Sequence, residues 1–170
     1  MDARSLQLPL SESAVRSLRV GTPVQLTGTI FTARDAVHKY LSGGQPAPCD
    51  LGQAVIYHCG PVVVREPNRW HLLAAGPTTS IREEPYMADL IAAHGLRAVI
   101  GKGSMGARTL AACRRYGCAY LHAVGGAAQV LAQAVEEVET VYLLEEFGAP
   151  EAIWQLRVRD FPALVTMDAA

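Results

Sequence analysis

The sequence predicts an α/β domain with a β-rich N-terminal half and a C-terminal half built from βαβ-like units. Two observations lead to this prediction. Alternating and β-branched segments dominate residues 6–65, whereas strand, glycine-rich turn and helix follow one another three times between residues 70 and 135. The second order is typical of a parallel sheet covered by helices. A length of 170 residues fits one domain spanning 1–170.

In the first half, the expected elements follow the local apolar pattern. Residues 6–10 alternate apolar and polar side chains as a half-buried strand does, and Ser11 can cap a short helical turn. Residues 23–32 are rich in β-branched side chains, which favour a strand interrupted by Gly28. Further expected elements are a helix over 35–41, a loop over 43–48, and strands over 54–57 and 61–65.

In the second half, residues typical of helix ends lie between short apolar segments that are expected to form strands. Pro85 and Gly95 suit the first turn and the position after the last turn of one helix. Ser104 is expected to cap another helix, which Gly117 ends. These signals predict helices over 85–94, 104–116 and 127–135, and strands over 70–75, 96–100, 118–124, 140–144, 154–158 and 164–167.

The turns at 76–82, 101–104 and 125–126 each follow an expected strand. Strand-to-helix turns of right-handed βαβ units emerge at the same edge of the sheet, so we expect these three to converge. Helix N-termini there add backbone N–H donors and a partial positive charge. The pattern predicts a site for a small anion such as a carboxylate or a phosphate, lined by Thr78, Thr79, Ser80, Arg82, Lys102 and Ser104.

Composition argues against several classes of protein. Lys and Arg number 15 against 16 Asp and Glu, and only 6% of residues are aromatic, so a nucleic-acid surface is not expected. No run of 18 apolar residues suggests a membrane span, and no secretory leader is apparent. The cysteines lack the spacing of a disulfide framework, which predicts free thiols and a cytoplasmic protein. They are Cys49, Cys59, Cys113 and Cys118.

The segment 101–106 matches the G-x-G-x-x-G pattern of dinucleotide sites. Such a site also needs an acidic residue at the end of the next strand, and 118–124 ends without one. Glycines that merely allow a tight turn are the plain alternative, and a nucleotide-dependent oxidoreductase remains a weaker one. A P-loop is excluded because Gly103, rather than Ser or Thr, follows Lys102. Cys113 and Cys118 lack two further ligands for a metal.

Arg34 lies at an expected strand-to-helix junction, where a bidentate carboxylate clamp can point inward. The charges that follow it, on Asp35, His38 and Lys39, also fit a solvated helix start.

Five segments together resemble a known family. They are GTIFTARDAVHK (28–39), GPTTSIR (76–82), IGKGSMG (100–106), YLHAVGGAA (120–128) and EAIWQLRVRDFPALVTMDA (151–169). The resemblance is to the β subunit of class I, iron–sulfur-dependent fumarate hydratases and L-tartrate dehydratases, equivalent to the C-terminal domain of the single-chain enzymes. It extends from about Leu6 to the C-terminus. It implies a swivelling β/β/α domain.

The resemblance also implies a division of labour. An α subunit binds a [4Fe–4S] cluster through three cysteines, and the β subunit adds cationic and hydroxyl side chains to the same site. The cysteines of this chain do not match the cluster motifs, so the resemblance implies that this chain alone binds no cluster or metal. A hetero-oligomer with the α subunit is expected, and a homo-oligomer is the alternative for the isolated chain.

By motif position, the resemblance implies that Arg34, Arg82 and Lys102 contact the substrate carboxylates, together with Thr79. Preorganised cations suit a dianion whose carboxylate gains charge when the neighbouring carbon loses its proton. Thr78 is implied near that carbon, either as the base or as an orienting hydrogen-bond donor. As a base it would need Lys102 or a helix N-terminus to favour its alkoxide.

Asp35 and His38 are expected to support Arg34 from behind the site. The chain departs from the family pattern at Glu83 and Ser104. A carboxylate at Glu83 can weaken dianion binding, shift the preference toward a more hydroxylated acid, or face solvent. The sequence thus predicts the β subunit of a hydro-lyase for a four-carbon dicarboxylate, with fumarate and malate preferred over L-tartrate. A non-catalytic module that binds small anions is the alternative.

Overall fold

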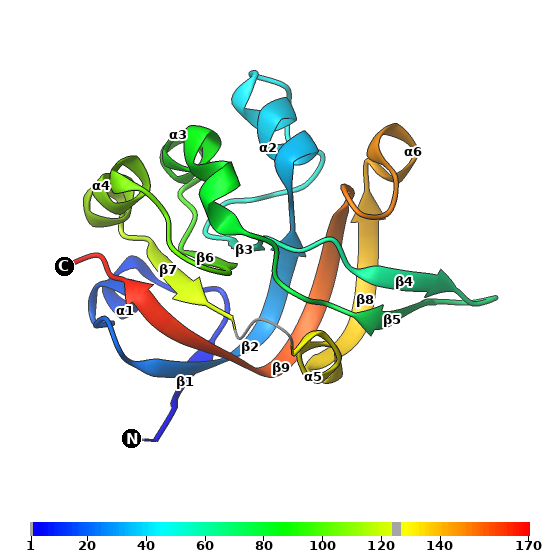
Figure 1. Ribbon diagram of the computed structural model, residues 1–170, viewed down its shortest axis with the longest axis horizontal. Coiled ribbons are helices and arrows are strands. Elements are labelled where there is room, and N and C mark those ends of the chain that lie inside the picture. The colour runs from blue at the N-terminus through cyan, green and yellow to red at the C-terminus, as the bar shows by residue number, and fades with distance from the viewer. Residues whose placement is uncertain (1, 124–126) are drawn as a thin grey trace.

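The computed structural model describes residues 2–123 and 127–170, and Figure 1 shows its elements. The strands are β1 (Arg4–Gln7), β2 (Pro23–Thr32), β3 (Val55–Tyr57), β4 (Val62–Arg65), β5 (Trp70–Ala74), β6 (Ala98–Gly101), β7 (Ala119–His122), β8 (Val135–Tyr142) and β9 (Ile153–Met167). The helices are α1 (Glu12–Arg16), α2 (Asp35–Ser42), the 3-10 helix η1 (Ser80–Glu83), α3 (Glu84–His94), α4 (Ala107–Tyr116), α5 (Ala128–Gln133) and α6 (Leu144–Phe147).

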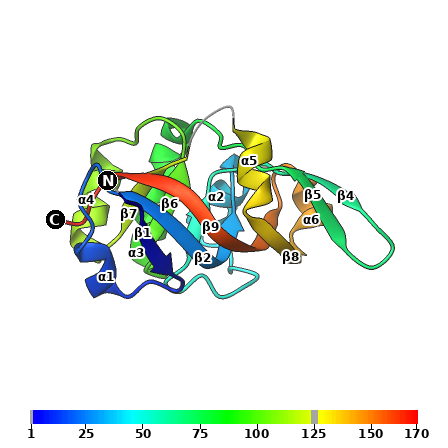
Figure 2. The ribbon, with the colours of Figure 1, turned by 90° about the horizontal axis from the view of Figure 1, so that it is seen from below.

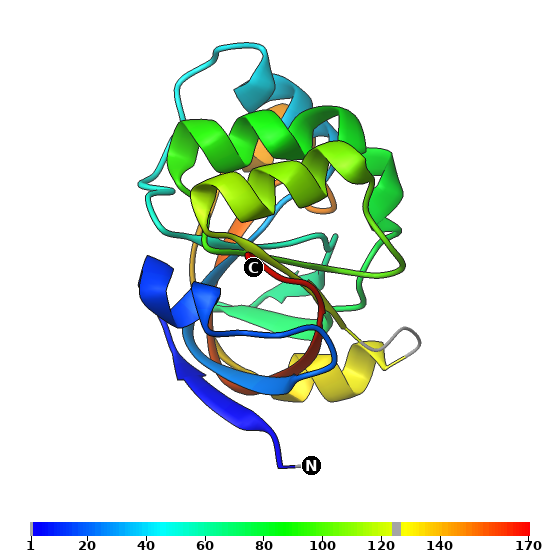
Figure 3. The same cartoon turned by 90° about the vertical axis from the view of Figure 1, so that its left-hand side faces the viewer.

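In the part of the chain that the structure describes, one mixed sheet has the strand order β1-β2-β3-β6-β7-β9-β8. The pairs from β1 to β7 are parallel, while β9 is antiparallel to β7, β8 and β2. Because β2 also pairs with β9, five strands form a closed circuit: β2, β3, β6, β7 and β9. Figure 3 shows these strands curving around a common interior, with α3 and α4 lying on one side.

Successive residues of the short parallel strands face two different cores. Tyr57 points into the interior that β9 closes, where it packs edge-on against Phe161 with ring centroids 5.2 Å apart. Its neighbour Ile56 belongs to the second core, beneath α2, α3 and α4. Side chains alternate in this way along every strand, and strands buried on both faces read as continuous apolar runs. The result is a mixed α/β architecture with helices over the parallel strands and β9 beneath them.

The strands β4 and β5 form a separate two-stranded antiparallel hairpin. Figures 1 and 2 show it extending away from the body of the molecule. The expectation that the strand at 70–75 belongs to the parallel sheet is therefore wrong. The turn at 66–69 brings β5 back onto β4, with the Glu66 N–H bonding the Arg69 carbonyl at 2.8 Å. Trp70 faces the core and packs edge-on against Trp154 at 5.1 Å.

Other differences from the sequence-based elements concern their ends. Gly106 rather than Ser104 precedes α4, and α5 ends at Gln133, since Val135 already pairs with β9. The strands expected at 154–158 and 164–167 are one strand, β9, which continues through Asp160 at a φ of 50°. The turn expected at 125–126 lies outside the described residues. Ser11 caps α1 as expected, accepting the Ala14 N–H at 3.1 Å.

Among the described residues, none of the helices combines the length and the apolar character that a bilayer crossing requires.

Candidate functional site

Two of the glycine-rich turns meet at the carboxyl ends of the parallel strands. Thr79 and Lys102 form an isolated parallel β-bridge. The Ser80 N–H donates to the Lys102 carbonyl at 3.0 Å, and the Lys102 N–H donates back to the Ser80 hydroxyl at 3.1 Å. The expectation that the turns at 76–82 and 101–104 converge is confirmed.

This close approach explains the glycine before Lys102. A Cβ on Gly101 would lie 1.7 Å from the Ser80 hydroxyl oxygen, so no side chain fits there. Gly103 has a φ of 77°, a left-handed conformation that favours glycine. Both glycines are therefore explained by the packing and bending of the turn.

The helix that follows this turn does not offer an open N-terminus. Glu84 accepts hydrogen bonds from the Gly106 N–H at 2.8 Å and from the Thr109 hydroxyl at 2.6 Å. The Thr109 N–H also donates to Glu84, at 3.2 Å. Because a carboxylate of the chain itself occupies this end of α4, the G-x-G-x-x-G match here does not support a dinucleotide phosphate site.

A third segment, just after β3, joins the two turns. The Thr78 N–H donates to the His58 carbonyl at 2.8 Å, and the Thr78 hydroxyl lies 3.3 Å from the same oxygen. The imidazole of His58 is fully buried, with Nδ1 2.8 Å from the Ser80 hydroxyl. Burial lowers the pKa of His58 well below its ordinary value, so the ring is neutral. His58 is not among the site residues predicted from the sequence. A histidine inside an apolar strand segment was the available signal, since a buried imidazole needs a polar partner.

Arg34 lies at the start of α2, above the same segment. Its Nη1 is 2.6 Å from the position that a Cβ on Gly60 would take, so Gly60 makes room for the guanidinium. Glu151 pairs with Arg34 at 3.5 Å and also accepts the Ala36 N–H at 3.0 Å. The Arg34 Nε is buried and has no hydrogen-bond partner among the described residues. Nε is also the atom that lies 3.5 Å from Glu151 Oε1, so this ion pair is formed without a hydrogen bond.

Arg82 lies at the end of the other turn and pairs with Asp35, at 2.5 Å between Nη2 and Oδ2. Its side chain is 59% exposed. A hydrogen bond from Glu83, and then the one from Arg82, holds the pKa of Asp35 below its ordinary value. Asp35 therefore forms its ion pair with Arg82, while the charge of Arg34 also acts on it, and the expected support of Arg34 by Asp35 stays a prediction.

His38 and Glu83 form a buried pair that sequence reasoning missed. His38 Nδ1 lies 2.5 Å from Glu83 Oε2, and each side chain is 1% exposed. His38 therefore contacts Glu83 rather than Arg34, and the solvent-facing alternative for Glu83 is wrong. The signal was the position of His38 on the buried face of α2, between Val37 and Leu41.

Lys102 completes the set of cations. Its side chain is half-buried, Thr78 is half-buried and Thr79 is exposed. Across residues 2–123 and 127–170, no ion pair holds the Lys102 ammonium, whereas Arg34 and Arg82 each pair with one carboxylate. Cations on neighbouring turns at one sheet edge are suited to binding an anion with more than one carboxylate.

The cysteines do not fit an iron–sulfur cluster. Burial raises the pKa of Cys59 to about 12 and that of Cys49 to about 11, so both thiols stay protonated. Cluster ligation needs thiolates that converge. Within the described parts of the chain, no group of three or more His, Cys, Asp or Glu side chains is placed to hold a metal ion.

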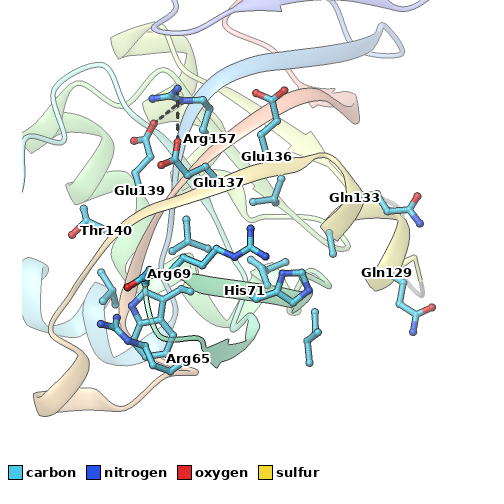
Figure 4. A pocket seen from close by; sticks show the side chains of 18 residues that line it. Arg65, Arg69, His71, Gln129, Gln133, Glu136, Glu137, Glu139, Thr140 and Arg157 are labelled. Carbon is cyan, nitrogen blue, oxygen red and sulfur yellow. Dashed lines mark hydrogen bonds and ion pairs between the residues drawn. The ribbon is translucent and has the colours of Figure 1, made fainter.

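A separate groove of about 1220 Å³ lies between the β4–β5 hairpin, α5 and β8, and Figure 4 shows its side chains. None of the sequence-predicted site residues lines it. Charges of both signs do, including Arg65 and Arg69 on the hairpin side and Glu136 and Glu137 on β8. The groove is thus distinct from the meeting point of the turns.

Comparison with known sequences gives the family. A family model described as Fumarase C-terminus matches residues 2–170 of this chain. The chain belongs to this family. A relative of this fumarase C-terminus chain, from Geobacillus stearothermophilus, is named putative fumarate hydratase class I and is 55% identical over 166 residues. The match covers 97% of this chain but only 32% of that relative, so the chain spans about a third of the relative's length.

Two further relatives match the fumarase C-terminus chain over most of their own length. A putative L(+)-tartrate dehydratase subunit beta of Methanocaldococcus jannaschii is 39% identical, over 94% of this chain and 85% of the relative. The L(+)-tartrate dehydratase subunit beta of Escherichia coli K12 is 36% identical, over 96% of this chain and 82% of the relative. The resemblance inferred from the sequence motifs is confirmed.

Proposed function

We propose that this chain is the β subunit of a hydro-lyase that adds water to, or removes it from, a four-carbon dicarboxylate. Fumarate and malate are the preferred substrates, and L-tartrate is the other candidate. The names of the relatives support this reaction class. The single structural observation that carries the proposal is the Thr79–Lys102 bridge, which joins two cation-bearing turns. In this proposal the chain is one swivelling β/β/α domain that acts in the cytoplasm.

The partner in this proposal is an α subunit that carries the [4Fe–4S] cluster. Two relatives are named subunit beta, which supports a hetero-oligomer. Within the described residues, no group of three or more metal-ligating side chains comes together in this chain, so we assign the cluster to the partner. The isolated chain is then inactive, because the site is complete only with the α subunit.

Arg34, Arg82 and Lys102 hold the two substrate carboxylates. When the carbon beside one carboxylate loses its proton, negative charge builds up on that carboxylate. Cations fixed before the reaction stabilise that charge without a further cost of reorganisation. Gly60 supports this role for Arg34, since the guanidinium needs the space that a side chain would fill.

Thr78 is the proposed base, and Thr79 orients the substrate. The Thr78 hydroxyl lies 3.3 Å from the His58 carbonyl, an acceptor that fixes its rotamer. A neutral hydroxyl is a weak base, so proton abstraction by Thr78 requires a nearby cation that stabilises its alkoxide. Lys102 lies on the bridged neighbouring turn and is the residue that we assign to this role.

Anaerobic reconstitution with the α subunit tests the proposal. We expect fumarate hydration by the wild-type complex and a loss of at least a hundredfold in Lys102→Met and Arg82→Ala, because each removes a charge from the site. Arg108→Ala is the matched control, since this exposed arginine pairs with Asp89 rather than with a residue of the two turns. The thermal unfolding of all variants should match the wild type. Near-normal turnover in Lys102→Met would contradict the assignment.

The same preparation separates the alternative function. Calorimetry with fumarate measures binding in the absence of turnover. If the complex binds the dianion through Arg82 and Lys102 but never hydrates it, the chain is an anion-binding module and the hydro-lyase proposal is wrong.

A further inference from the structure

Behind Arg82, the chain buries an acid and an imidazole that the proposed reaction does not use. Glu83 ends η1 and His38 lies in the second turn of α2, so two separate elements bring the pair together. Their contact, Glu83 Oε2 to His38 Nδ1, is 2.5 Å long. A buried pair of this kind is costly unless each polar atom has a partner.

The surroundings of Glu83 are more acidic than basic. The charged groups that act on it are the carboxylates of Asp35 and Glu151 and the guanidinium of Arg82, in addition to the ring of His38. Within the described residues, no arginine or lysine forms an ion pair with Glu83. Burial, and next the neighbouring Asp35, raises the pKa of Glu83 to about 9. Burial lowers the pKa of His38 to about 4.

One set of hydrogen-bond directions suits these contacts. A protonated Glu83 has one O–H to donate, and Asp35, whose lowered pKa is attributed first to Glu83, is the carboxylate suited to accept it. The other oxygen of Glu83 accepts from His38 Nδ1–H, which leaves His38 Nε2 as a bare lone pair. That atom is buried and has no hydrogen-bond partner among the described residues. Asp35 then accepts from Glu83 on one side and from Arg82 on the other.

We propose that Glu83, held by His38, is a positioning residue for Arg82: it donates its carboxyl proton to Asp35 and so fixes the carboxylate that holds the Arg82 guanidinium at the site. This inference rests on the proposed function, in which Arg82 binds a substrate carboxylate. An uncharged Glu83 also spares the site a second negative charge beside Arg82. Glu83, which departs from the family pattern, therefore has a role in binding the substrate dianion in this proposal.

Variants at position 83 test this role in the reconstituted complex. Glu83→Gln keeps a donor for Asp35 and an acceptor for His38, whereas Glu83→Met keeps neither. We expect KM for fumarate to stay within about threefold of the wild type in Glu83→Gln, and to rise about tenfold in Glu83→Met with a smaller change in kcat. Equal KM values in Glu83→Met and the wild type, or equal losses in both variants, would overturn the proposal.

The pH dependence of KM distinguishes the proposed role of Glu83 from a purely structural one. In the wild type, KM should rise above about pH 8, as Glu83 begins to lose its proton. In Glu83→Gln, which has no such proton, this rise should be absent. The same alkaline rise in Glu83→Gln would show that another group causes it, and the proposal would be wrong.

A second measurement does not depend on activity. As a unit, the folded pair keeps one proton between about pH 4 and about pH 9, whereas in the unfolded chain the ordinary pKa values are 6.5 for His38 and 4.5 for Glu83. Above pH 6.5 the unfolded chain therefore binds fewer protons, and stability falls as pH rises. The unfolding equilibrium constant of the full chain should rise up to about tenfold per pH unit between pH 7 and 9, and Glu83→Gln should lack this component.

The two measurements keep the two proposals apart. Equal slopes in wild type and Glu83→Gln would overturn the protonated Glu83, whatever the enzyme assay shows. A wild-type complex without hydro-lyase activity would overturn the proposed function, while the slopes still decide whether Glu83 carries the proton.

Discussion

Replacing Gly101 by alanine tests how tightly the two turns are packed. The new Cβ would lie 1.7 Å from the Ser80 hydroxyl and 3.0 Å from the Tyr120 hydroxyl, so the Ser80 side chain must move. Overpacking of this kind costs about 1–3 kcal/mol, and a buried N–H left without its acceptor, here that of Lys102, costs about 1–3 kcal/mol. We expect the free energy of unfolding to fall by about 2–6 kcal/mol.

Urea unfolding followed by circular dichroism measures this loss. In a thermal melt, a domain of this size should lose about 4–24 °C in Tm. Gly43→Ala is the matched control, because Gly43 has a φ of −75° and its nearest atom, the Lys39 carbonyl oxygen, is 3.2 Å from the added Cβ. In a Ser80→Gly background, Gly101→Ala should cost much less, which a double-mutant cycle detects. A Gly101→Ala protein within about 0.5 kcal/mol of the wild type would refute the reasoning.

Two further predictions concern the helix cap and the thiols. Glu84→Ala should cost about 1–2 kcal/mol at pH 7, because it removes the acceptor of three bonds at the start of α4. Although burial acts in the opposite direction, the bonds from Thr109 and the backbone lower the pKa of Glu84, so the difference from wild type in urea unfolding should shrink as pH falls below about 4.5. Of the four cysteines, only Cys49 is not fully buried, so a thiol reagent at pH 8 should modify at most one thiol in the native chain and four after unfolding. Rapid labelling of two or more native thiols would contradict this burial.

The sequence predicts the elements whose ends carry local signals. Pro85 and Gly95 bound α3, and Gly117 ends α4, because the backbone conformations required there depend on single residues. The pairing of β5 with β4 and the continuity of β9 were not predicted. A strand's partner is set by contacts between distant segments, which the local pattern does not encode.

The candidate site also has one feature that the sequence predicted and one that it did not. The turns at 76–82 and 101–104 converge as expected, because Thr79 and Lys102 form a bridge. The reason differs from the one expected, since the rule for parallel strands does not apply to β5, which lies outside the parallel sheet. The burial of Glu83 depends on how α2 packs against η1. A charged residue in an expected turn gives no indication of this packing. The position of His38 was the available signal for a buried polar contact, because a histidine on the apolar face of a helix needs a polar partner.

The contact between Ser80 and Gly101 has a consequence for how related sequences can diverge. Since the hydroxyl at one position occupies the space of a side chain at the other, neither position can be altered freely while its neighbour stays as it is. A related chain with alanine at 101 would need glycine or a displaced side chain at 80, which constrains the order in which the two positions can change. Among homologues, these two positions should therefore change together, although twenty residues separate them along the chain.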